Sequence, residues 1–142
     1  MVKKISILAS IFIILFFCSC EKQEKQMEDR DKFVGRWDVV ENVANKSLNE
    51  INMAYIANIA RSETFPDETY IYNFFNVSDE YYIPAYVKEK NIIIEKITLR
   101  DYTVRGSGTL SENENVIDWI YWVEGPYDDH EIKYIATYTL HK

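Results

Sequence analysis

The sequence VIDWIYWV at residues 116–123 decides the fold, because large apolar side chains occupy every second position. Ile117, Trp119 and Tyr121 fall on one face of an extended strand, and Asp118 and Trp122 fall on the other. We expect the face with Asp118 to point outward, which leaves Trp122 partly exposed. Strict alternation over this length is typical of a strand with one buried face.

Runs with the same alternation occur on both sides of this strand. They cover residues 33–39, 69–75, 81–87, 92–97, 102–110 and 131–140. Most of the separators are four to six residues long and rich in turn-forming residues, which is too short for parallel crossovers. We therefore predict an all-β protein, an antiparallel up-and-down meander of about eight strands that closes as a small barrel. A β-sandwich is the alternative.

Residues 47–60 fit two kinds of secondary structure. Ser47-Leu48-Asn49-Glu50 is typical of a capping box, and Leu48, Ile51, Tyr55 and Ile59 then recur at helical spacing. The same segment also alternates as a strand, with Met53, Tyr55, Ala57 and Ile59 on one face. Because the meander needs a strand here, we expect one from about Ala54, with a helical turn before it.

The N-terminus is typical of a lipoprotein signal peptide. Lys3 and Lys4 precede an apolar run at residues 5–17, which is shorter than the roughly 20 residues that a membrane-spanning helix needs. The small Ser19 precedes Cys20, which indicates a lipobox. We predict that residues 1–19 are a signal peptide and that Cys20 is the lipid-modified first residue of the mature protein. An ordinary secretory peptide is the alternative.

Residues 20–32 are predicted to connect this lipid to the folded domain at residues 33–142. Nine of the twelve residues from Glu21 to Lys32 are charged, and they offer no apolar stripe, so we expect a solvated tether. The whole chain carries a net charge of −7, which disfavours nucleic-acid binding. The membrane contact is then the N-terminal lipid, in the outer membrane, on its periplasmic face or at the cell surface.

Several short motifs carry a family resemblance. They are Phe33-x-Gly35-x-Trp37, Ile71-x-Asn73-Phe74, Gly106-Ser107-Gly108, Trp119-x-Tyr121-x-Val123 and Ala136-Thr137-Tyr138. With these motifs the domain resembles the small lipocalin-like lipoproteins of Gram-negative bacteria, which are compact relatives of the calycin barrels. In lipocalins the tryptophan of G-x-W closes the barrel floor beneath a basic residue of the last strand. The basic candidates in this chain are Lys133, His141 and Lys142.

No pattern in the sequence indicates catalysis, a metal site or a cofactor. Cys20 is the only cysteine that remains after residues 1–19 are removed, and His130 lies in a predicted turn beside two aspartates. Ser107 lies between two glycines of an alternating strand, which is no nucleophile elbow. We expect Gly106 and Gly108 to let the barrel wall bend, with close approach of another backbone or of a ligand as the alternative. The protein is not expected to be an enzyme.

Aromatic residues are the one feature in excess, with eleven Tyr, seven Phe and three Trp in the chain. The candidates for the barrel interior and a ligand site are Trp37, Tyr55, Trp119, Tyr121, Tyr134 and Tyr138. The candidates for an outer contact surface are Trp122 and one or other of Tyr81 and Tyr82. Because the inward side chains are large, we expect a nearly filled interior.

These residues support two functions. The first is a binding module for a small apolar or aromatic-stacking ligand, held at the open end of the barrel. The alternative is a structural or accessory lipoprotein that binds another envelope protein or a glycan through its outer aromatic surface and loops.

The anchor prediction is tested with Cys20→Ala. Without the thiol no lipid can be attached, and an acidic domain has no membrane affinity of its own. We expect the variant to be released or mislocalised on cell fractionation, with the fold of residues 33–142 unchanged by circular dichroism. A variant that stays on membranes through a high-salt wash contradicts the anchor.

Overall fold

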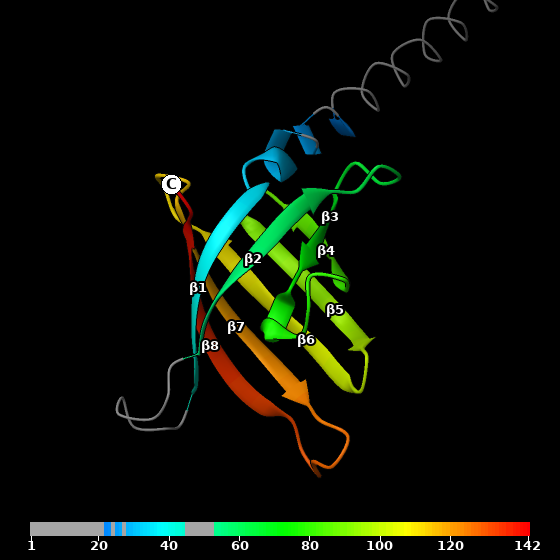
Figure 1. The fold of residues 1–142 in the computed structure, drawn as a ribbon. Coiled ribbons are helices and arrows are strands. Elements are labelled where there is room, and N and C mark those ends of the chain that lie inside the picture. The colour runs from blue at the N-terminus through cyan, green and yellow to red at the C-terminus, as the bar shows by residue number, and fades with distance from the viewer. Residues whose placement is uncertain (1–21, 24, 27, 45–52) are drawn as a thin grey trace, which may run out of the picture.

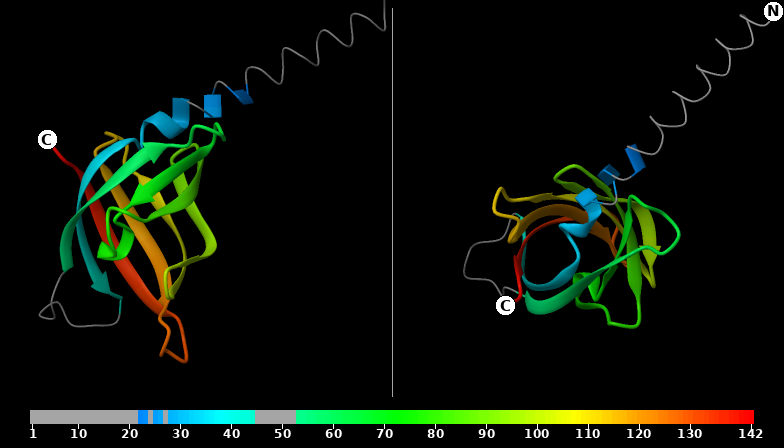
Figure 2. Two further views of the ribbon diagram at one scale, coloured as in Figure 1. Left: turned by 45° about the vertical axis from the view of Figure 1, so that its right-hand side comes forward. Right: turned by 90° about the horizontal axis from the view of Figure 1, so that it is seen from above.

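The computed structural model describes residues 22–23, 25–26, 28–44 and 53–142 of the chain. Within them, eight antiparallel strands follow one another around a closed barrel, and β1 pairs with β8 to complete the ring (Figure 1; Figure 2). The strands are β1 (Gly35–Val43), β2 (Met53–Arg61), β3 (Glu68–Tyr72), β4 (Tyr82–Lys88), β5 (Asn91–Leu99), β6 (Tyr102–Leu110), β7 (Val116–Glu124) and β8 (Ile132–Leu140). The predicted up-and-down, lipocalin-like barrel is confirmed, and the β-sandwich alternative is wrong.

Side chains along β7 alternate between the interior and the outer wall, as the sequence predicts. Trp119 and Tyr121 are fully buried in the interior, whereas Ile120 is exposed on the outer wall. The strand form of residues 47–60 is also confirmed from Met53 onward, where β2 begins and pairs with β1. The predicted capping box at residues 47–50 lies outside the described residues.

The strand predicted at residues 69–75 ends three residues early. After β3 the backbone of Asn73 turns left-handed, with a φ of 55°, and a short 3-10 segment, η1 (Phe74–Asn76), follows. Because the extended chain is broken there, Phe74 is buried in the same interior as Ile71, although strict alternation assigns them to opposite faces.

The strand predicted at residues 92–97 extends to Leu99 and contains an irregularity. Its pairing with β6 shifts between Ile94 and Ile97. The inward positions are therefore Ile92 and Ile94 before the shift and Ile97 and Leu99 after it, and an exposed pair of residues, 95–96, separates them. An extra residue of this kind keeps apolar side chains inside while the strand bends.

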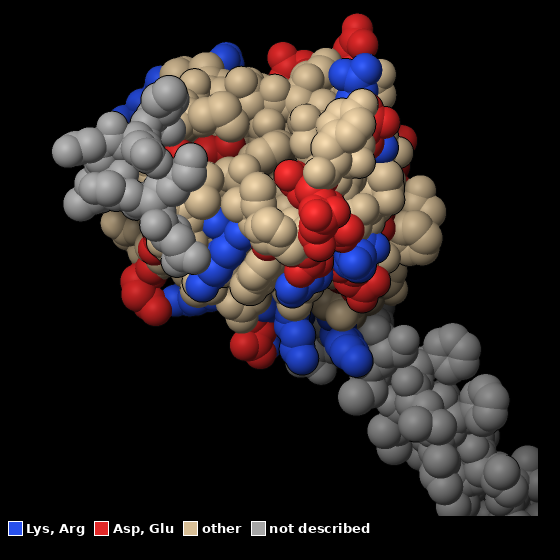
Figure 3. Space-filling model, turned by 90° about the horizontal axis from the view of Figure 1, so that it is seen from below, with Lys and Arg blue, Asp and Glu red and all other residues tan. Residues whose placement is uncertain are grey.

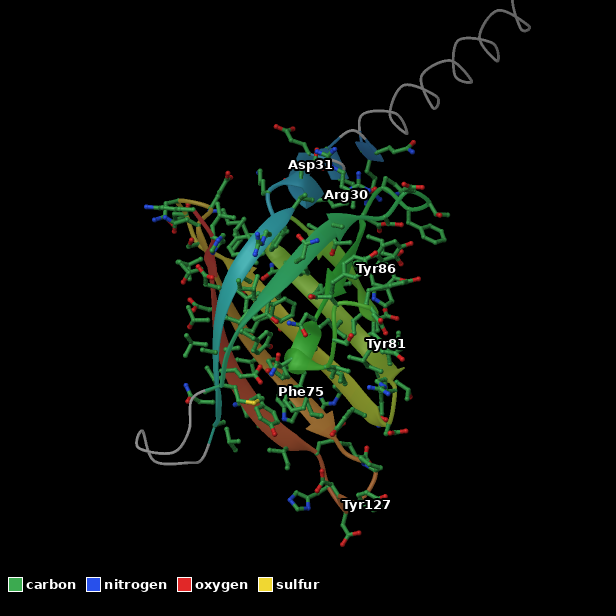
Figure 4. The ribbon with its side chains drawn as sticks, in the orientation of Figure 1. Arg30, Asp31, Phe75, Tyr81, Tyr86 and Tyr127 are labelled. Carbon is green, nitrogen blue, oxygen red and sulfur yellow. The ribbon has the colours of Figure 1, made fainter. Side chains whose placement is uncertain are left out.

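One end of the barrel is closed by residues before β1. Residues 28–31 are helical, and the guanidinium of Arg30, only 5% exposed, donates two hydrogen bonds of 3.0 Å to the carbonyls of Ser62 and Phe65 (Figure 4). The solvated tether expected up to Lys32 is therefore wrong for Arg30, because the loop after β2 supplies carbonyls that a buried cation needs. At this closed end Trp37 donates from Nε1 to the carbonyl of Phe33.

Glycines on β6 make room for aromatic rings on β7. In the register of the two strands Gly106 lies opposite Tyr121, and Gly108 lies opposite Trp119. A Cβ atom on Gly106 would overlap the Cβ of Tyr121 and lie 2.7 Å from the carbonyl oxygen of Ile120, and one on Gly108 would lie 2.7 Å from the Trp119 ring. The close approach that these glycines permit is thus made by the protein's own side chains.

This packing predicts that Gly106→Ala is destabilising. The new methyl group meets backbone atoms, which cannot rotate away, so we expect a loss of at least about 2 kcal/mol in the free energy of unfolding. Ser107→Ala on the exposed side of the same strand is the control, with a change within about 0.5 kcal/mol. Urea unfolding followed by tryptophan fluorescence measures both, and equal stability of the two variants refutes the packing argument.

Candidate functional site

The structure places the six predicted interior residues inside the barrel but does not gather them all. Trp37, Trp119, Tyr121 and Tyr138 are fully buried. Tyr55 and Tyr134 are half-buried and pack against that core. Trp37 belongs to the closed end, whereas Tyr121 and Tyr134 stack on each other, with ring centroids 5.5 Å apart, towards the opposite end of the barrel.

We call this opposite end, where η1 and residues 100–101 lie, the mouth. A pocket of about 480 Å³ opens there. Its lining residues are Met53, Phe75, Asn76, Val77, Arg100, Asp101 and Tyr102. Figure 3 views the molecule from this end, where acidic and basic side chains lie among uncharged surface. A pocket at the mouth of a β-barrel is a common place for a small ligand.

Phe75, labelled in Figure 4, lines this pocket, and its ring packs against three tyrosine rings. Its centroid lies 5.0 Å from that of Tyr134, 5.8 Å from that of Tyr102 and 6.3 Å from that of Tyr121, in edge-to-face arrangements that favour aromatic pairs. We call these three tyrosine rings the aromatic box. The backbone amide of Phe75 also donates a 3.1 Å hydrogen bond to the hydroxyl of Tyr55. Phe75 is therefore a plug between the pocket and the deeper interior.

The plug is held in a strained backbone conformation. Phe75 has a φ of 56°, and its neighbour Asn76 has a φ of 53°. The left-handed region costs a bulky residue about 1–2 kcal/mol, because its Cβ crowds the following carbonyl. The contacts of the ring in the aromatic box offset this cost, and the strain is relieved if the segment leaves the left-handed conformation when the ring leaves the box.

On the interior side of the plug lies a buried carboxylate, Glu41, which is only 1% exposed. Oε2 of Glu41 accepts hydrogen bonds from two hydroxyls, that of Tyr55 at 2.8 Å and that of Tyr121. Oε1 of Glu41 has no hydrogen-bond partner among the described residues. Two further buried polar atoms of the interior, Nε1 of Trp119 and the hydroxyl of Tyr138, also have none there. The part of the interior around Glu41 is thus polar, and not all of its polar atoms are hydrogen-bonded.

Burial raises the pKa of the Glu41 carboxyl above its usual value, and the hydrogen bonds from Tyr121 and Tyr55 offset part of that rise. Burial also raises the pKa of the hydroxyls of Tyr55, Tyr121 and Tyr138. All three hydroxyls therefore remain protonated at neutral pH, and those of Tyr55 and Tyr121 act as donors to Glu41.

Glu41 and Phe75 are not among the site residues predicted from the sequence. Glu41 lies two residues beyond Val39 on the inward face, so the signal was a charged residue at an inward position, just past the predicted end of the strand at residue 39. Phe75 carried no such signal, because its position depends on the left-handed turn after β3.

The predicted outer residues lie in two separate places. Tyr82 on β4 packs beside Tyr70 and Tyr72, with ring centroids 4.5 and 5.5 Å away, and Tyr81 is also exposed, under the guanidinium of Arg100. Both tyrosines are exposed, where one was expected. Trp122 lies on β7 and is half-exposed.

A groove of about 560 Å³ adjoins the tyrosines of β3. Its lining residues are Arg36, Ile56, Asn58, Tyr72, Asn73 and Asp79. Trp122 is not among these lining residues. Its ring, on β7, is covered by the guanidinium of Arg105 at 4.4 Å and the ammonium of Lys133 at 5.8 Å. The outer tyrosines therefore form a surface beside a groove. The ring of Trp122 lies apart from them and is covered by cations of the chain itself.

The described residues contain no cluster of three metal-binding side chains. They also contain no helix with the length and hydropathy to cross a membrane. Cys20 and the predicted signal peptide lie outside them. The sequence matches no protein-family model, and it has no significant match among curated proteins.

The environment of Glu41 predicts a pH-dependent stability. Because its pKa is raised in the folded state, its protonated form favours folding below the ordinary carboxyl pKa, and that contribution is lost as the pH rises through the folded-state pKa. Glu41→Gln cannot ionise, so its stability relative to wild type should improve between about pH 4 and about pH 8 in urea unfolding.

Glu131→Gln is the control with the opposite sign. Hydrogen bonds of 3.0 and 3.1 Å from Arg105 lower the pKa of Glu131, so this carboxylate stabilises the fold above its ordinary pKa and loses that effect in acid. The control variant should lose stability relative to wild type between about pH 4 and about pH 8. The same trend in both variants contradicts the account of Glu41.

Proposed function

We propose that this chain is a lipid-anchored envelope lipoprotein whose barrel binds a small apolar or aromatic ligand at its mouth. One observation carries the proposal: the ring of Phe75 lines a pocket of about 480 Å³ and at the same time occupies the aromatic box. A side chain that fills such a box from a short irregular segment can be replaced by a ligand ring of similar size.

The energetics of the plug support an exchange of this kind. Phe75 gains the contacts of the box but holds a left-handed backbone, so its net preference for the closed position is smaller than the contacts alone would give. Only three residues form η1, and they are joined to β3 by Asn73, which is also left-handed. A ligand ring gains the same contacts without the strain.

The direction of the chain fits an anchored receptor. Residues 28–31 lie at the closed end of the barrel, and Phe75 lies towards the other end (Figure 4). A lipid on Cys20 would hold the closed end nearer to the membrane and leave the mouth open to solutes. The barrel and the G-x-W motif at its first strand support a place among the small lipocalin-like lipoproteins, in the outer membrane on either face.

A second candidate rests on the outer surface. The rings of Tyr70, Tyr72 and Tyr82 pack together beside a groove with one arginine, one aspartate and two asparagines in its lining. Aromatic faces stack on sugar rings, and such polar side chains bond hydroxyl groups. This surface suits a glycan or another envelope protein, as an accessory lipoprotein requires.

Native mass spectrometry of the full chain, purified from membranes in detergent, separates the two candidates. If the mouth holds a ligand, we expect a retained small molecule whose occupancy rises in Phe75→Ala, because the competing ring is gone. Tyr82→Ala is the matched control on the outer surface and should leave the occupancy unchanged.

Two results count against ligand binding at the mouth. One is a protein without any bound molecule across wild type and both variants. The other is a retained molecule that is lost in Tyr82→Ala but unchanged in Phe75→Ala, which supports the outer surface instead.

A further inference from the structure

The interior gives the ligand of the mouth a specific chemistry, and the key group is Glu41. Its carboxylate is removed from solvent, with one oxygen satisfied by two tyrosine hydroxyls and the other without a partner among the described residues. The ion pairs that the described residues form do not include Glu41. A buried carboxylate without a cation is an unfavourable arrangement, unless a partner arrives from outside.

The side chain of Glu41 belongs to the same cluster as the plug, through its other oxygen, Oε2. Phe75 is linked to Glu41 through one intervening tyrosine side chain on each of two routes. On one route its amide bonds the hydroxyl of Tyr55, which bonds Glu41. On the other its ring packs on Tyr121, whose hydroxyl bonds Glu41. A ligand that takes the place of the Phe75 ring therefore packs on the residue whose hydroxyl bonds the carboxylate, and a side arm directed inward approaches Glu41.

Tyrosine rings and a carboxylate together select for positive charge. The faces of the rings attract cations through their quadrupoles, and the attraction is stronger where water is excluded. An ammonium group also donates hydrogen bonds to a carboxylate and neutralises it. A neutral ligand offers the unpaired oxygen no charge, and an anionic ligand is repelled by it. The net charge of −7 on the chain favours the approach of cations as well.

We propose that the barrel binds a small organic ammonium ion with an aromatic or apolar body, whose ring replaces that of Phe75 and whose ammonium group pairs with Oε1 of Glu41. This inference rests on the proposed function, since it names the ligand class of the same site. The hydroxyls of Tyr55 and Tyr121 hold the carboxylate in place, and the box of Tyr102, Tyr121 and Tyr134 holds the body of the ligand.

The test uses two probes that differ in one group, 2-phenylethylammonium and 2-phenylethanol. Calorimetry measures their affinities for the full chain as wild type, as Phe75→Ala and as Phe75→Ala with Glu41→Gln, all at neutral pH. Phe75→Ala should bind the ammonium probe at least about tenfold more tightly than the alcohol, as a charge-assisted hydrogen bond implies. Wild type should show the same preference with weaker binding, because Phe75 competes.

The second substitution isolates the charge. In Phe75→Ala with Glu41→Gln the preference for the ammonium probe should disappear, while the affinity for the alcohol stays within a small factor. Tyr82→Ala, on the outer surface, should change neither affinity. If the double variant does not fold, the comparison of the two probes on Phe75→Ala alone decides.

Three outcomes overturn the inference in distinguishable ways. Equal affinity of Phe75→Ala for both probes refutes the proposed ammonium ligand but is compatible with an aromatic ligand at the mouth. A preference that survives Glu41→Gln removes Glu41 as its cause. If neither probe binds to any variant, both the proposed function and this inference are refuted.

Discussion

The structure depends on the fixed width of its interior. A closed barrel of eight strands has space for its own side chains or for one small ligand, so a large ring on one strand needs a small residue beside it. Gly106 and Gly108 meet this need for Tyr121 and Trp119 on the neighbouring strand. Because these two rings enter the interior, Tyr121 reaches across to Glu41 on β1 and also supports the ring of Phe75. The site is a consequence of how the barrel is filled.

Stability alone does not account for Glu41. An apolar side chain of similar size would fill the same space without desolvation of a carboxyl group and without an unsatisfied oxygen. The hydroxyls of Tyr55 and Tyr121 satisfy only one of its two oxygens. Strain at Phe75 adds a second local cost in the same cluster. Unfavourable features that gather below a pocket are typical of a binding site, where a ligand compensates for them.

Local patterns in the sequence were sufficient for the wall of the barrel. Alternation placed Trp119 and Tyr121 inside, and short turns implied antiparallel neighbours, because both depend on residues that are close in sequence. The two ends and the site depend on contacts between distant residues. The bond between Tyr121 and Glu41 joins positions 80 residues apart, and Arg30 bonds carbonyls more than thirty residues away. Periodicity does not show where a strand ends, and the end of β3 decides the position of Phe75.

A crystal structure of the full chain with 2-phenylethylammonium shows whether the ligand replaces the ring of Phe75 and pairs with Glu41. We expect the ammonium nitrogen about 2.7–3.2 Å from Oε1 of Glu41, the phenyl ring in the present position of the Phe75 ring against Tyr102, Tyr121 and Tyr134, and the ring of Phe75 outside the box. A ligand bound elsewhere, with the ring of Phe75 still in the box and Oε1 of Glu41 without a partner, would contradict this binding mode.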